Sequence, residues 1–361
     1  MKLKKNLLKL GSASALLSLL LSANVWASDG MQVHFLNVGQ ADSTLITCGD
    51  HAMLIDAGND DDDVPVLNYI QNKQGISHLD YIICTHPHED HIGAMDAVIN
   101  TVDVHEVLMP DVTTTTQTFD DLLTAIDSNG LSITVPEVGQ TYTLGDASFT
   151  ILAPVNDYGD DLNNWSIGLK LTCGDSDFVF TGDAEANAEG DILATGIDLD
   201  AEVFQAGHHG SSTSNSDALL SAISPDYVVI SCGEGNSYGH PNAETIDRFQ
   251  NYGIQIFRTD KQGTVVASTD GSTITWSTDP TTDYSSGDGI SSNNDDASYY
   301  KETEVPAEEP IYTGVTVHIT ETGSKYHSAG CQYLSKSDIE VSLSEAKAMV
   351  LEACSRCNPP A

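Results

Sequence analysis

Residues 85–91 read Thr-His-Pro-His-Glu-Asp-His and place three imidazoles and two carboxylates within seven positions. Imidazole nitrogen and carboxylate oxygen are ligands that suit Zn²⁺, Mn²⁺ and iron. The spacing of His86, His88, Asp90 and His91 therefore predicts a metal site. The alternative is a polar loop that happens to be rich in histidine. We favour the metal site because this combination of residues rarely assembles by chance.

The elements around this heptad indicate how its side chains are positioned. An apolar run, residues 81–84, precedes the heptad, and a helix-like segment, residues 92–99, follows it. The heptad therefore follows a buried strand, at the edge of the sheet where α/β proteins place their ligands.

Two later strand-like runs also end in side chains that can bind metals. Asp183 follows residues 178–180, and His208 and His209 follow residues 201–205. Asp183 alone could be a turn aspartate, but beside the heptad we expect it to bridge two metals. On an extended backbone only one of the two adjacent histidines can face a given metal. We expect one of them to be a ligand and the other to support it, to contact substrate or to be structural.

Two further residues are candidates for the same site. Asp56 ends a strand-like run, and we expect it to orient a metal ligand rather than to bind the metal itself. His240 lies in a Tyr-Gly-His-Pro turn and is a candidate to protonate a leaving group or to contact a phosphate. It is equally well interpreted as a residue at a helix start, followed by a proline at the first helical position.

The C-terminal segment carries a second group of metal ligands. His327 and Cys331 are followed by Cys354 and Cys357, a pattern that suits a closed tetrahedral zinc site. A capping box at residues 342–345 predicts a helix that leads to Cys354. A domain this small needs a cross-link, and in an exported protein that could instead be a disulfide from Cys331 to Cys354 or Cys357. We favour structural zinc on the ligand spacing.

The N-terminus predicts export. Residues 1–27 combine four lysines and no acidic residue with an apolar stretch and small residues before a cleavage site near Ala27, as in a secretory signal peptide. No second long apolar run follows, so we expect no membrane association. The whole chain has a net charge of −39. Such acidity argues against a broad nucleic-acid-binding groove, but it permits a metal site that binds a single phosphodiester group locally.

The chain is predicted to be an α/β protein with two domains. Residues 31–278 alternate strand-like and helical runs, which is enough for one large domain. Residues 279–310 are rich in Ser, Asp, Asn and Glu, as in a flexible acidic linker. Residues 311–361 form a small α+β domain. Of the seven cysteines, Cys48, Cys84, Cys173 and Cys232 lie in or beside apolar runs and are expected to be buried thiols.

The large domain resembles the metallo-β-lactamase-fold hydrolases, and more narrowly the hydrolase domain of ComEC-type DNA-uptake proteins. The resemblance covers about residues 31–278. It is carried by the heptad and by these further motifs: residues 34–42 (His-Phe-Leu-Asn-Val-Gly-Gln-Ala-Asp), 55–58 (Ile-Asp-Ala-Gly), 181–183 (Thr-Gly-Asp), 207–211 (Gly-His-His-Gly-Ser) and 238–241 (Tyr-Gly-His-Pro). It implies a four-layer αββα sandwich with two divalent metals, zinc or manganese, at one edge.

The resemblance also implies individual roles. His86 and His88 would bind the first metal, Asp90 and His91 the second, and Asp183 both. One of His208 and His209 would complete the second site, and Asp90 would also orient the nucleophile.

One expected ligand is missing. Many family members have a further histidine on the first metal, between the heptad and the bridging aspartate. Here residues 92–182 contain only His105, which comes too early in the chain. ComEC-type sequences have an Asn/Ser stretch instead, matched by residues 163–166. Asn164 and Ser166 are therefore candidates for supporting or substrate contacts.

The function implied is that of a secreted hydrolase whose metal-bridging hydroxide attacks a phosphodiester, with nucleic acid as one possible substrate. The alternatives are a carboxyl-ester, lactone or lactam hydrolase of the same superfamily, or a metal-containing binding protein with weak activity. The C-terminal segment resembles the small zinc-binding domain of the Ada DNA-repair protein, with His327 where that pattern has a cysteine.

Overall fold

The computed structural model describes residues 30–287 and, near the C-terminus, residues 316–319, 325–329, 331–334, 339–342, 352–354 and 356–357. The chain divides into two compact units, Met1–Asn293 and Asn294–Ala361. The expected signal segment, residues 1–27, and most of the expected linker, residues 288–310, lie outside the described residues. Within the described residues, no helix combines the length and the apolar character needed to cross a membrane.

The first unit contains a sheet of eight strands in the order β15-β14-β1-β2-β3-β4-β5-β6. The strands from β3 to β6 run parallel, and the others pair antiparallel. The strands are β1 (Met31–Phe35), β2 (Thr44–Cys48), β3 (His51–Ile55), β4 (His78–Ile83), β5 (Asp103–Leu108), β6 (Ile133–Thr134), β14 (Val265–Thr269) and β15 (Ile274–Trp276).

A second sheet has seven strands in the order β13-β12-β11-β10-β9-β8-β7. Here the strands from β10 to β13 run parallel. The strands are β7 (Thr141–Leu144), β8 (Ala147–Ala153), β9 (Gly168–Cys173), β10 (Ser176–Phe180), β11 (Val203–Gln205), β12 (Tyr227–Ile230) and β13 (Gln255–Arg258).

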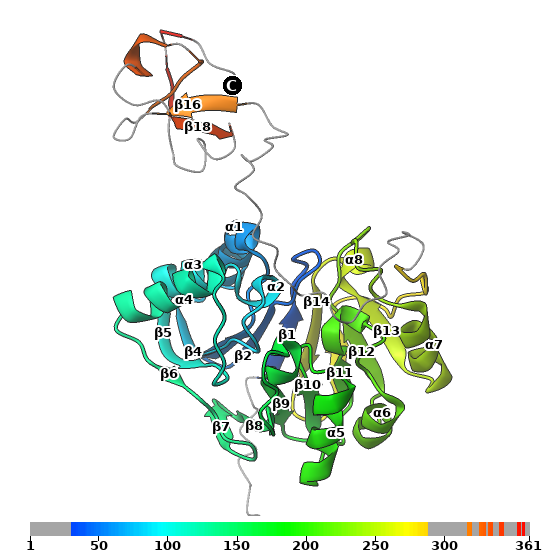
Figure 1. Ribbon diagram of the computed structural model, residues 1–361. Helices are drawn as coiled ribbons and strands as arrows, with labels where there is room; N and C mark the ends of the chain where they lie inside the picture. The colour runs from blue at the N-terminus through cyan, green and yellow to red at the C-terminus, as the bar shows by residue number, and fades with distance from the viewer. Residues whose placement is uncertain are drawn as a thin grey trace, which may run out of the picture. The chain divides into compact units, whose positions relative to one another are not determined.

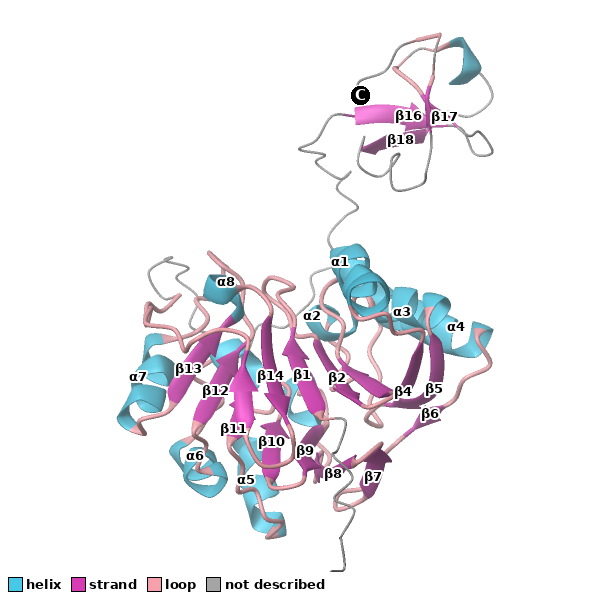
Figure 2. Cartoon of the chain, turned by 180° about the vertical axis from the view of Figure 1, so that it is seen from behind, coloured by secondary structure: helices cyan, strands magenta, loops and turns pink. Residues whose placement is uncertain are grey.

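Helices cover the outer face of each sheet (Figures 1 and 2). The first sheet carries α1 (Asp63–Leu67), a π-helical turn (Asn68–Lys73), α2 (Glu89–Ile92), α3 (Met95–Thr101) and α4 (Gln117–Ser128). The second carries α5 (Ala186–Thr195), α6 (Asp217–Ile223) and α7 (Ala243–Asn251), and α8 (Thr259–Gln262) follows β13. This arrangement confirms the predicted αββα sandwich.

Side-chain alternation along the strands builds three apolar layers. In β10, Phe178 and Phe180 point into the core between the sheets, whereas Val179 packs under the helices of the second sheet. In β12, Val229 faces inward and Val228 faces the helices. Strands that are buried on both faces read as continuous apolar runs rather than as alternating ones. This is why the central strands could be recognised from the sequence.

The first unit is longer than the sequence suggested. Residues 279–287, expected in the linker, pack against it: the amide of Thr281 donates to Ile256 O (2.7 Å), and the amide of Gly287 donates to Pro241 O (2.9 Å). The Arg258 guanidinium also donates to Ser285 O. The boundary predicted at residue 278 therefore falls short of the packed segment.

The second unit contains two small two-stranded sheets. Antiparallel β16 (Thr316–Ile319) and β18 (Ile339–Ser342) form one, and parallel β17 (Lys325–Tyr326) and β19 (Glu352–Ala353) form the other. A 3₁₀ turn spans Gln332–Leu334. The helix expected after Ser342 lies outside the described residues; Ser342 itself ends a strand.

Candidate metal centre

The site lies where strands of both sheets end. Asp56 follows β3, the heptad follows β4, Asp183 follows β10, and the two adjacent histidines follow β11. All four strands belong to the parallel parts of their sheets, so their carboxyl ends meet at one edge of the sandwich. Residues more than a hundred positions apart in the sequence are thereby brought together.

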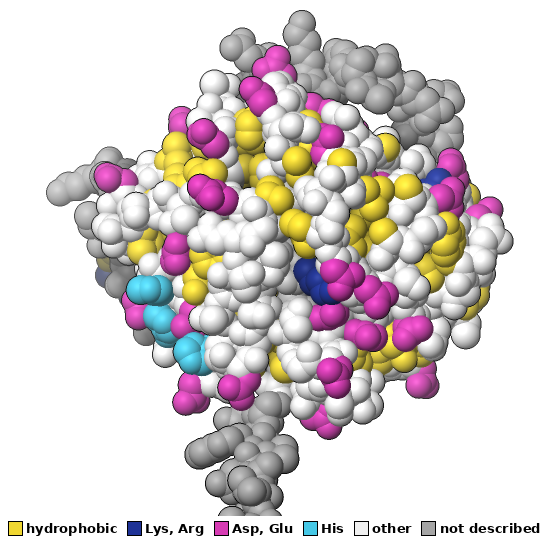
Figure 3. Space-filling model, turned by 90° about the horizontal axis from the view of Figure 1, so that it is seen from below, with side chains coloured by type: hydrophobic (Ala, Val, Ile, Leu, Met, Phe, Trp, Pro, Cys, Tyr) yellow, Lys and Arg dark blue, Asp and Glu magenta, His cyan; other side chains and the backbone are white. Residues whose placement is uncertain are grey.

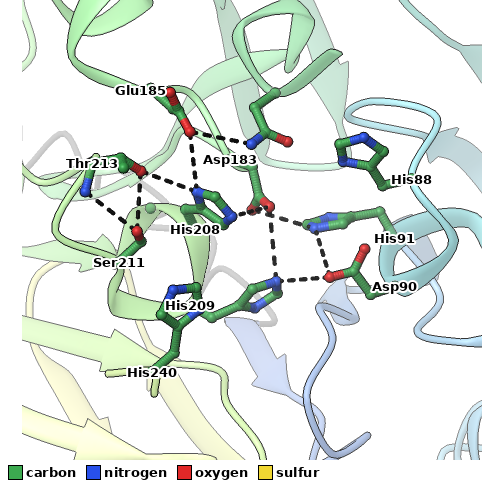
Figure 4. A network of polar contacts seen from close by, with 12 residues as sticks. His88, Asp90, His91, Asp183, Glu185, His208, His209, Ser211, Thr213 and His240 are labelled. Carbon is green, nitrogen blue, oxygen red and sulfur yellow. Dashed lines mark hydrogen bonds and ion pairs between the residues drawn. The ribbon is translucent and has the colours of Figure 1, made fainter. Parts of the chain in front are cut away.

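The Asp183 carboxylate is the centre of the cluster (Figure 4). Its Oδ1 lies 3.3 Å from His91 Nε2. Its Oδ2 lies 3.5 Å from His208 Nε2, 3.8 Å from His209 Nε2 and 3.9 Å from His86 Nε2. The carboxylate is only 2% exposed, so four imidazoles surround a buried anion.

The other two heptad residues complete the cluster. His88 Nδ1 lies 2.9 Å from His86 Nε2. Asp90 Oδ2 lies 3.1 Å from His209 Nε2 and 3.9 Å from His91 Nε2. Asp90, His91, Asp183 and His209 each offer a ligand atom within 4.8 Å of the others, a set that could hold one metal ion.

The outer nitrogen of each imidazole around Asp183 is held by the protein. Metal-binding histidines are usually oriented in this way, by a hydrogen bond at the nitrogen that does not bind the metal. The partners of the outer Nδ1 atoms are Ser166 Oγ for His86 (3.3 Å), Asp56 Oδ2 for His91 (2.8 Å), Thr213 Oγ1 for His208 (3.3 Å) and Ser231 O for His209 (3.1 Å).

Asp56 supports the heptad rather than entering the cluster. Besides His91, it accepts hydrogen bonds from the Thr85 amide (2.8 Å) and the Thr85 hydroxyl (2.7 Å). It is 1% exposed and has φ of 56°, a left-handed conformation that aspartate tolerates better than most residues. The sequence predicted that Asp56 orients a metal ligand, and here its carboxylate contacts His91 and Thr85.

Charge in the cluster is balanced between acids and imidazoles. Burial alone would lower the pKa of His91, but Asp183, Asp90 and Asp56 outweigh it and raise that pKa well above its ordinary value. Burial likewise would raise the pKa of Asp183, but His91, His208 and His209 hold it well below its usual range. In the metal-free protein the surrounding carboxylates therefore favour the protonated form of His91.

The residues present fit a divalent metal. Within the described part of the chain, His91 Nε2 and Asp183 Oδ1 are buried without a hydrogen-bond partner, although they face each other. Unpaired buried polar atoms are costly unless another group satisfies them. A cation bound between these atoms would satisfy both.

The double histidine differs from the sequence-based expectation. The backbone is not extended there: His208 has φ 53° and ψ 48°, and His209 has φ 54° and ψ 24°. Because both residues are left-handed, both rings reach the Asp183 carboxylate. The extended backbone on which that expectation depended is absent here, because the sign of φ at non-glycine residues cannot be read from the sequence.

Asn164 and Ser166 have different roles. The Ser166 hydroxyl accepts from the Asp183 amide (3.0 Å) and touches His86, so it lies directly behind the cluster. The Asn164 side-chain oxygen accepts from the amides of Glu185 (3.0 Å) and Ala188 (3.3 Å) and so holds the start of α5. Gly182, which directly precedes Asp183, has φ of 52°, and a Cβ there would lie 2.9 Å from Ser166 Oγ.

His240 lies beside the cluster but is not a helix-start residue. Helix α7 begins at Ala243 with Asn242 as its N-cap, so the interpretation with a proline at the first helical position was wrong. The His240 ring packs against the rings of His208 and His209, at centroid distances of 5.3 and 6.3 Å. Burial and these two histidines lower the pKa of His240 to about 3.

Three supporting residues were missed in the sequence. Glu185 Oε1 lies 3.6 Å from His208 Nδ1, and Asp42 Oδ1 lies 3.3 Å from His209 Nδ1. Asn215 binds the backbone of Gly207 and Ser211 on either side of the double histidine. Asp42 lay inside a recognised motif, but acidic residues are so frequent in this chain that composition gave no signal.

The second unit contains the other predicted cluster. Ligand atoms of His327, Cys331, Cys354 and Cys357 lie within 4.8 Å of one another. Pairing of β17 with β19 causes this, because it places Tyr326 beside Ala353 and so brings the two halves of the motif together. Backbone amides of Arg356 and Cys357 lower the pKa of the Cys354 thiol. All three cysteines are free thiols.

The remaining cysteines are as expected. Cys48, Cys84, Cys173 and Cys232 are buried free thiols in the first unit. Burial raises the pKa of Cys232 to about 12 and that of Cys173 to about 11, which leaves both thiols protonated and unreactive at neutral pH.

Comparison with known proteins assigns the family. The sequence model of the metallo-beta-lactamase superfamily matches residues 36–234, more than half of the chain. The chain belongs to the metallo-β-lactamase superfamily. Membership makes the first unit a metallohydrolase fold and implies divalent metal ions at its cluster.

Curated relatives refine the position within the superfamily. ComE operon protein 3 of Bacillus subtilis is 29% identical over 192 residues, covering 53% of this chain and 25% of that protein. Recombination protein 2 of Haemophilus influenzae is 29% identical over 239 residues, covering 65% and 28%. The chain thus spans about a quarter of either relative, 25% and 28%, and the ComEC-like resemblance is confirmed for the hydrolase domain alone.

Among solved structures, the metallo-beta-lactamase fold protein YhfI from Bacillus subtilis is similar, with 13% identity and a TM-score of 0.46. The similarity covers 67% of this chain and 100% of that one.

Proposed function

We propose that the first unit is a metal-dependent phosphodiesterase that cleaves nucleic acid or a related phosphodiester. The observation that carries the proposal is the convergence of five imidazoles and two carboxylates, from the ends of several strands, on one buried point around Asp183. This arrangement has the composition of a site for two divalent cations, with Asp183 available to both.

The roles of the residues follow from their positions. His86 and His88 would hold one cation, and Asp90, His91 and His209 the other. Bound divalent cations supply Lewis acidity, which makes water a nucleophile at neutral pH and stabilises negative charge on a leaving oxygen. Asp90, at 31% side-chain exposure, is the carboxylate of the cluster that solvent reaches and is placed to orient attacking water. His240 packs beside the cluster, where it could contact a phosphate or the leaving group.

The names of the relatives support a phosphodiester substrate. They include a competence protein, ComA of Neisseria gonorrhoeae, and a recombination protein. Both names refer to processes that handle DNA, whose backbone is a phosphodiester. Since this chain matches only part of each relative, only the chemistry of the shared domain is transferred here.

The surface charge limits how such a substrate could bind. Acidic side chains are spread over the face shown in Figure 3, with few Lys or Arg side chains among them. Residues 28–315 contain 48 acidic and six basic residues. Long-range attraction of a polyanion is therefore absent from this part of the sequence, and recognition would depend on contacts with one or two phosphates at the cations.

The test is hydrolysis of bis-p-nitrophenyl phosphate and of single-stranded DNA by the protein loaded with Zn²⁺ or Mn²⁺. Asp183→Asn removes the central anion, and we expect a loss of activity of at least about 100-fold because both cations lose a ligand. Asp103→Asn, on the surface, is the matched control. Turnover of lactams or esters without phosphodiester turnover, or metal binding with no turnover, would contradict the proposal.

Two further proposals concern the rest of the chain. We propose that His327, Cys331, Cys354 and Cys357 bind one structural Zn²⁺, because four such ligands within reach of one another suit tetrahedral coordination. Zinc counting before and after Cys354→Ser tests this, and a disulfide in the purified protein would contradict it. We also propose export with cleavage near Ala27, which the mass of the secreted protein would test.

A further inference from the structure

In the proposed two-cation site, His86, His88 and the shared Asp183 would hold the first cation, whereas Asp90, His91, His209 and Asp183 would hold the second. The segment between the heptad and Asp183 offers no third imidazole for the first cation, since it contains only His105, which is exposed on β5. Ser166 does not replace it, since its hydroxyl accepts from the Asp183 amide behind the cluster. Asn164 does not replace it either, because its side chain holds the start of α5.

We propose that His208 supplies a third imidazole to the first cation, so that the two adjacent histidines bind different cations: His208 the first, with His86 and His88, and His209 the second. This inference rests on the proposed two-cation site. It goes beyond it by giving His208, which the proposed function leaves unassigned, a definite place as a ligand.

The contacts of His208 are those of a metal-binding histidine. Its Nε2 is 3.5 Å from Asp183 Oδ2, an oxygen that also faces His86 (3.9 Å) and His209 (3.8 Å). Its other nitrogen, Nδ1, is held by Thr213 (3.3 Å) and by the Glu185 carboxylate (3.6 Å). A ring fixed at Nδ1 by a carboxylate and a hydroxyl, with Nε2 turned toward a buried anion, is oriented for coordination.

His209 is committed to the other side of the cluster. Its Nε2 lies closer to Asp90 Oδ2 (3.1 Å) than to Asp183 Oδ2 (3.8 Å). His208 forms no ion pair with Asp90 among the described residues, and its carboxylate contacts are Asp183 and Glu185. The two rings, 6.0 Å apart and inclined at 65°, therefore serve different parts of the site.

The backbone gives an independent reason. Two consecutive non-glycine residues in the left-handed region cost roughly 1–2 kcal/mol each. An ordinary extended exit from β11 would present one histidine to the site without this cost. The conformation observed here brings both rings to one carboxylate, and such strain is typically retained where function requires it.

Metal counting on the full mature chain tests the assignment. The variants are His208→Gln, His209→Gln and His86→Gln, together with the double variants His208→Gln/His86→Gln and His208→Gln/His209→Gln. His105→Gln is the matched control, an exposed histidine outside the cluster. Zn²⁺ content after dialysis and affinity by chelator competition are the readouts. Circular dichroism confirms that each variant is folded.

If His208 and His86 hold the same cation, each single variant loses one Zn²⁺ and their double variant loses no more than one. The His208→Gln/His209→Gln variant then loses two, and His105→Gln loses none. Glu185→Gln, which leaves every ligand in place, is expected to weaken one Zn²⁺ by about 10–100-fold. This milder variant keeps the test valid if His208→Gln fails to fold.

Two results would overturn the inference. In the first, His208→Gln retains the wild-type Zn²⁺ content and affinity. In the second, the His208→Gln/His86→Gln variant loses two cations. Either result leaves the proposed phosphodiesterase standing if the wild-type protein still hydrolyses the phosphodiester. A wild-type first unit that binds fewer than two cations would overturn both proposals.

Discussion

Asp56 is a buried carboxylate behind the cluster. Its Oδ2 lies 2.8 Å from His91 Nδ1, and the carboxylate accepts two hydrogen bonds from Thr85. A substitution that keeps its shape but removes its charge isolates this effect. Such supporting contacts typically contribute 10–100-fold to metal affinity.

We therefore predict that Asp56→Asn weakens Zn²⁺ binding by about 10–100-fold while the protein stays folded. Chelator competition measures the affinity. Asp103→Asn is a close control, since Asp103 also lies 2.9 Å from a histidine, His78, but at the exposed start of β5. Equal affinities in the two variants would show that Asp56 does not orient His91.

The pKa shifts of the cluster predict how stability changes with pH. In the metal-free protein the pKa of His91 is raised above its unfolded value of about 6.5. Its stabilising charge is then fully present below about pH 6.5 and is lost as the pH rises through the folded-state pKa. Asp183, whose pKa is lowered, loses its contribution only in acid, as the pH falls through the folded-state value.

Chelator-treated protein should therefore lose thermal stability as the pH rises from about 6.5 to 9, whereas Zn²⁺ should stabilise it more at the higher pH because bound imidazoles must be deprotonated. Melting temperatures with and without chelator measure both trends. A metal-free protein that becomes more stable over this range would show that His91 is not held as a cation.

For individual residues, the sequence predicted which side chains form the site better than it predicted their backbone conformations. The heptad, Asp183 and Asp56 were found because residue type and a preceding apolar strand are both visible in sequence. The sequence did not predict that both His208 and His209 face Asp183. This arrangement depends on positive φ angles at two residues that are not glycines, and such angles leave no sign in the sequence. Glu185 was also missed, since one acidic residue among so many carries no signal.

The loop between β11 and α6 holds two consecutive histidines in the left-handed backbone conformation. Asn215 spans that loop: its side chain accepts from the Gly207 amide (2.8 Å) and donates to Gly207 O (2.9 Å) and Ser211 O (3.1 Å). Glu189 of α5 in turn accepts from the Asn215 and Ser216 amides. Helix α5 thereby supports the histidines without touching them.

Asn215→Gly tests this support, since glycine accepts the φ of 64° found at this position and only the side-chain hydrogen bonds are lost. With three hydrogen bonds worth about 0.5–1.5 kcal/mol each, the unfolding free energy should fall by about 1.5–4.5 kcal/mol. Zn²⁺ affinity should fall about tenfold or more. Denaturant unfolding and chelator competition measure these, with exposed Asn251→Gly as control. Unchanged affinity despite lower stability would indicate a structural role alone.

Among the helices and strands, those buried on both faces were the ones that the sequence predicted best. Strands β4 and β10 are covered on both faces and stood out as the apolar runs at residues 81–84 and 178–180. Strand β7 gives no comparable signal, because it is short and only partly buried, with three of its four residues exposed or intermediate.

For the whole molecule, the contrast in charge between the two parts of the sequence is the main feature. Residues 316–361 contain five acidic and four basic residues, whereas the part before them is strongly acidic. An anionic substrate is therefore repelled much less by the C-terminal part of the chain than by the hydrolase domain. The boundary between the parts also matters, since residues 279–287 pack on the first unit.

Truncation distinguishes the packed segment from the linker. A chain that ends at residue 287 should keep the stability of the first unit. A chain that ends at 278 loses the hydrogen bonds of Thr281, Ser285 and Gly287 and should lose about 1.5–4.5 kcal/mol, at 0.5–1.5 kcal/mol for each bond. Thermal and denaturant melts compare the two. Equal stability would place the functional boundary at residue 278 after all.

The cluster draws its atoms from the ends of strands in two different sheets, and this has a consequence for how the sandwich holds together. A cation bound there would cross-link the two sheets at the edge of the sandwich where the apolar core gives way to polar side chains. Removing the cation would leave this edge held by direct polar contacts between the sheets, such as the hydrogen bond from the Ile167 amide to Thr85 O (2.8 Å) and the His91–Asp183 ion pair (3.3 Å). In the metal-free protein we expect local unfolding to begin at this edge and to expose the loops that follow the strands to proteases.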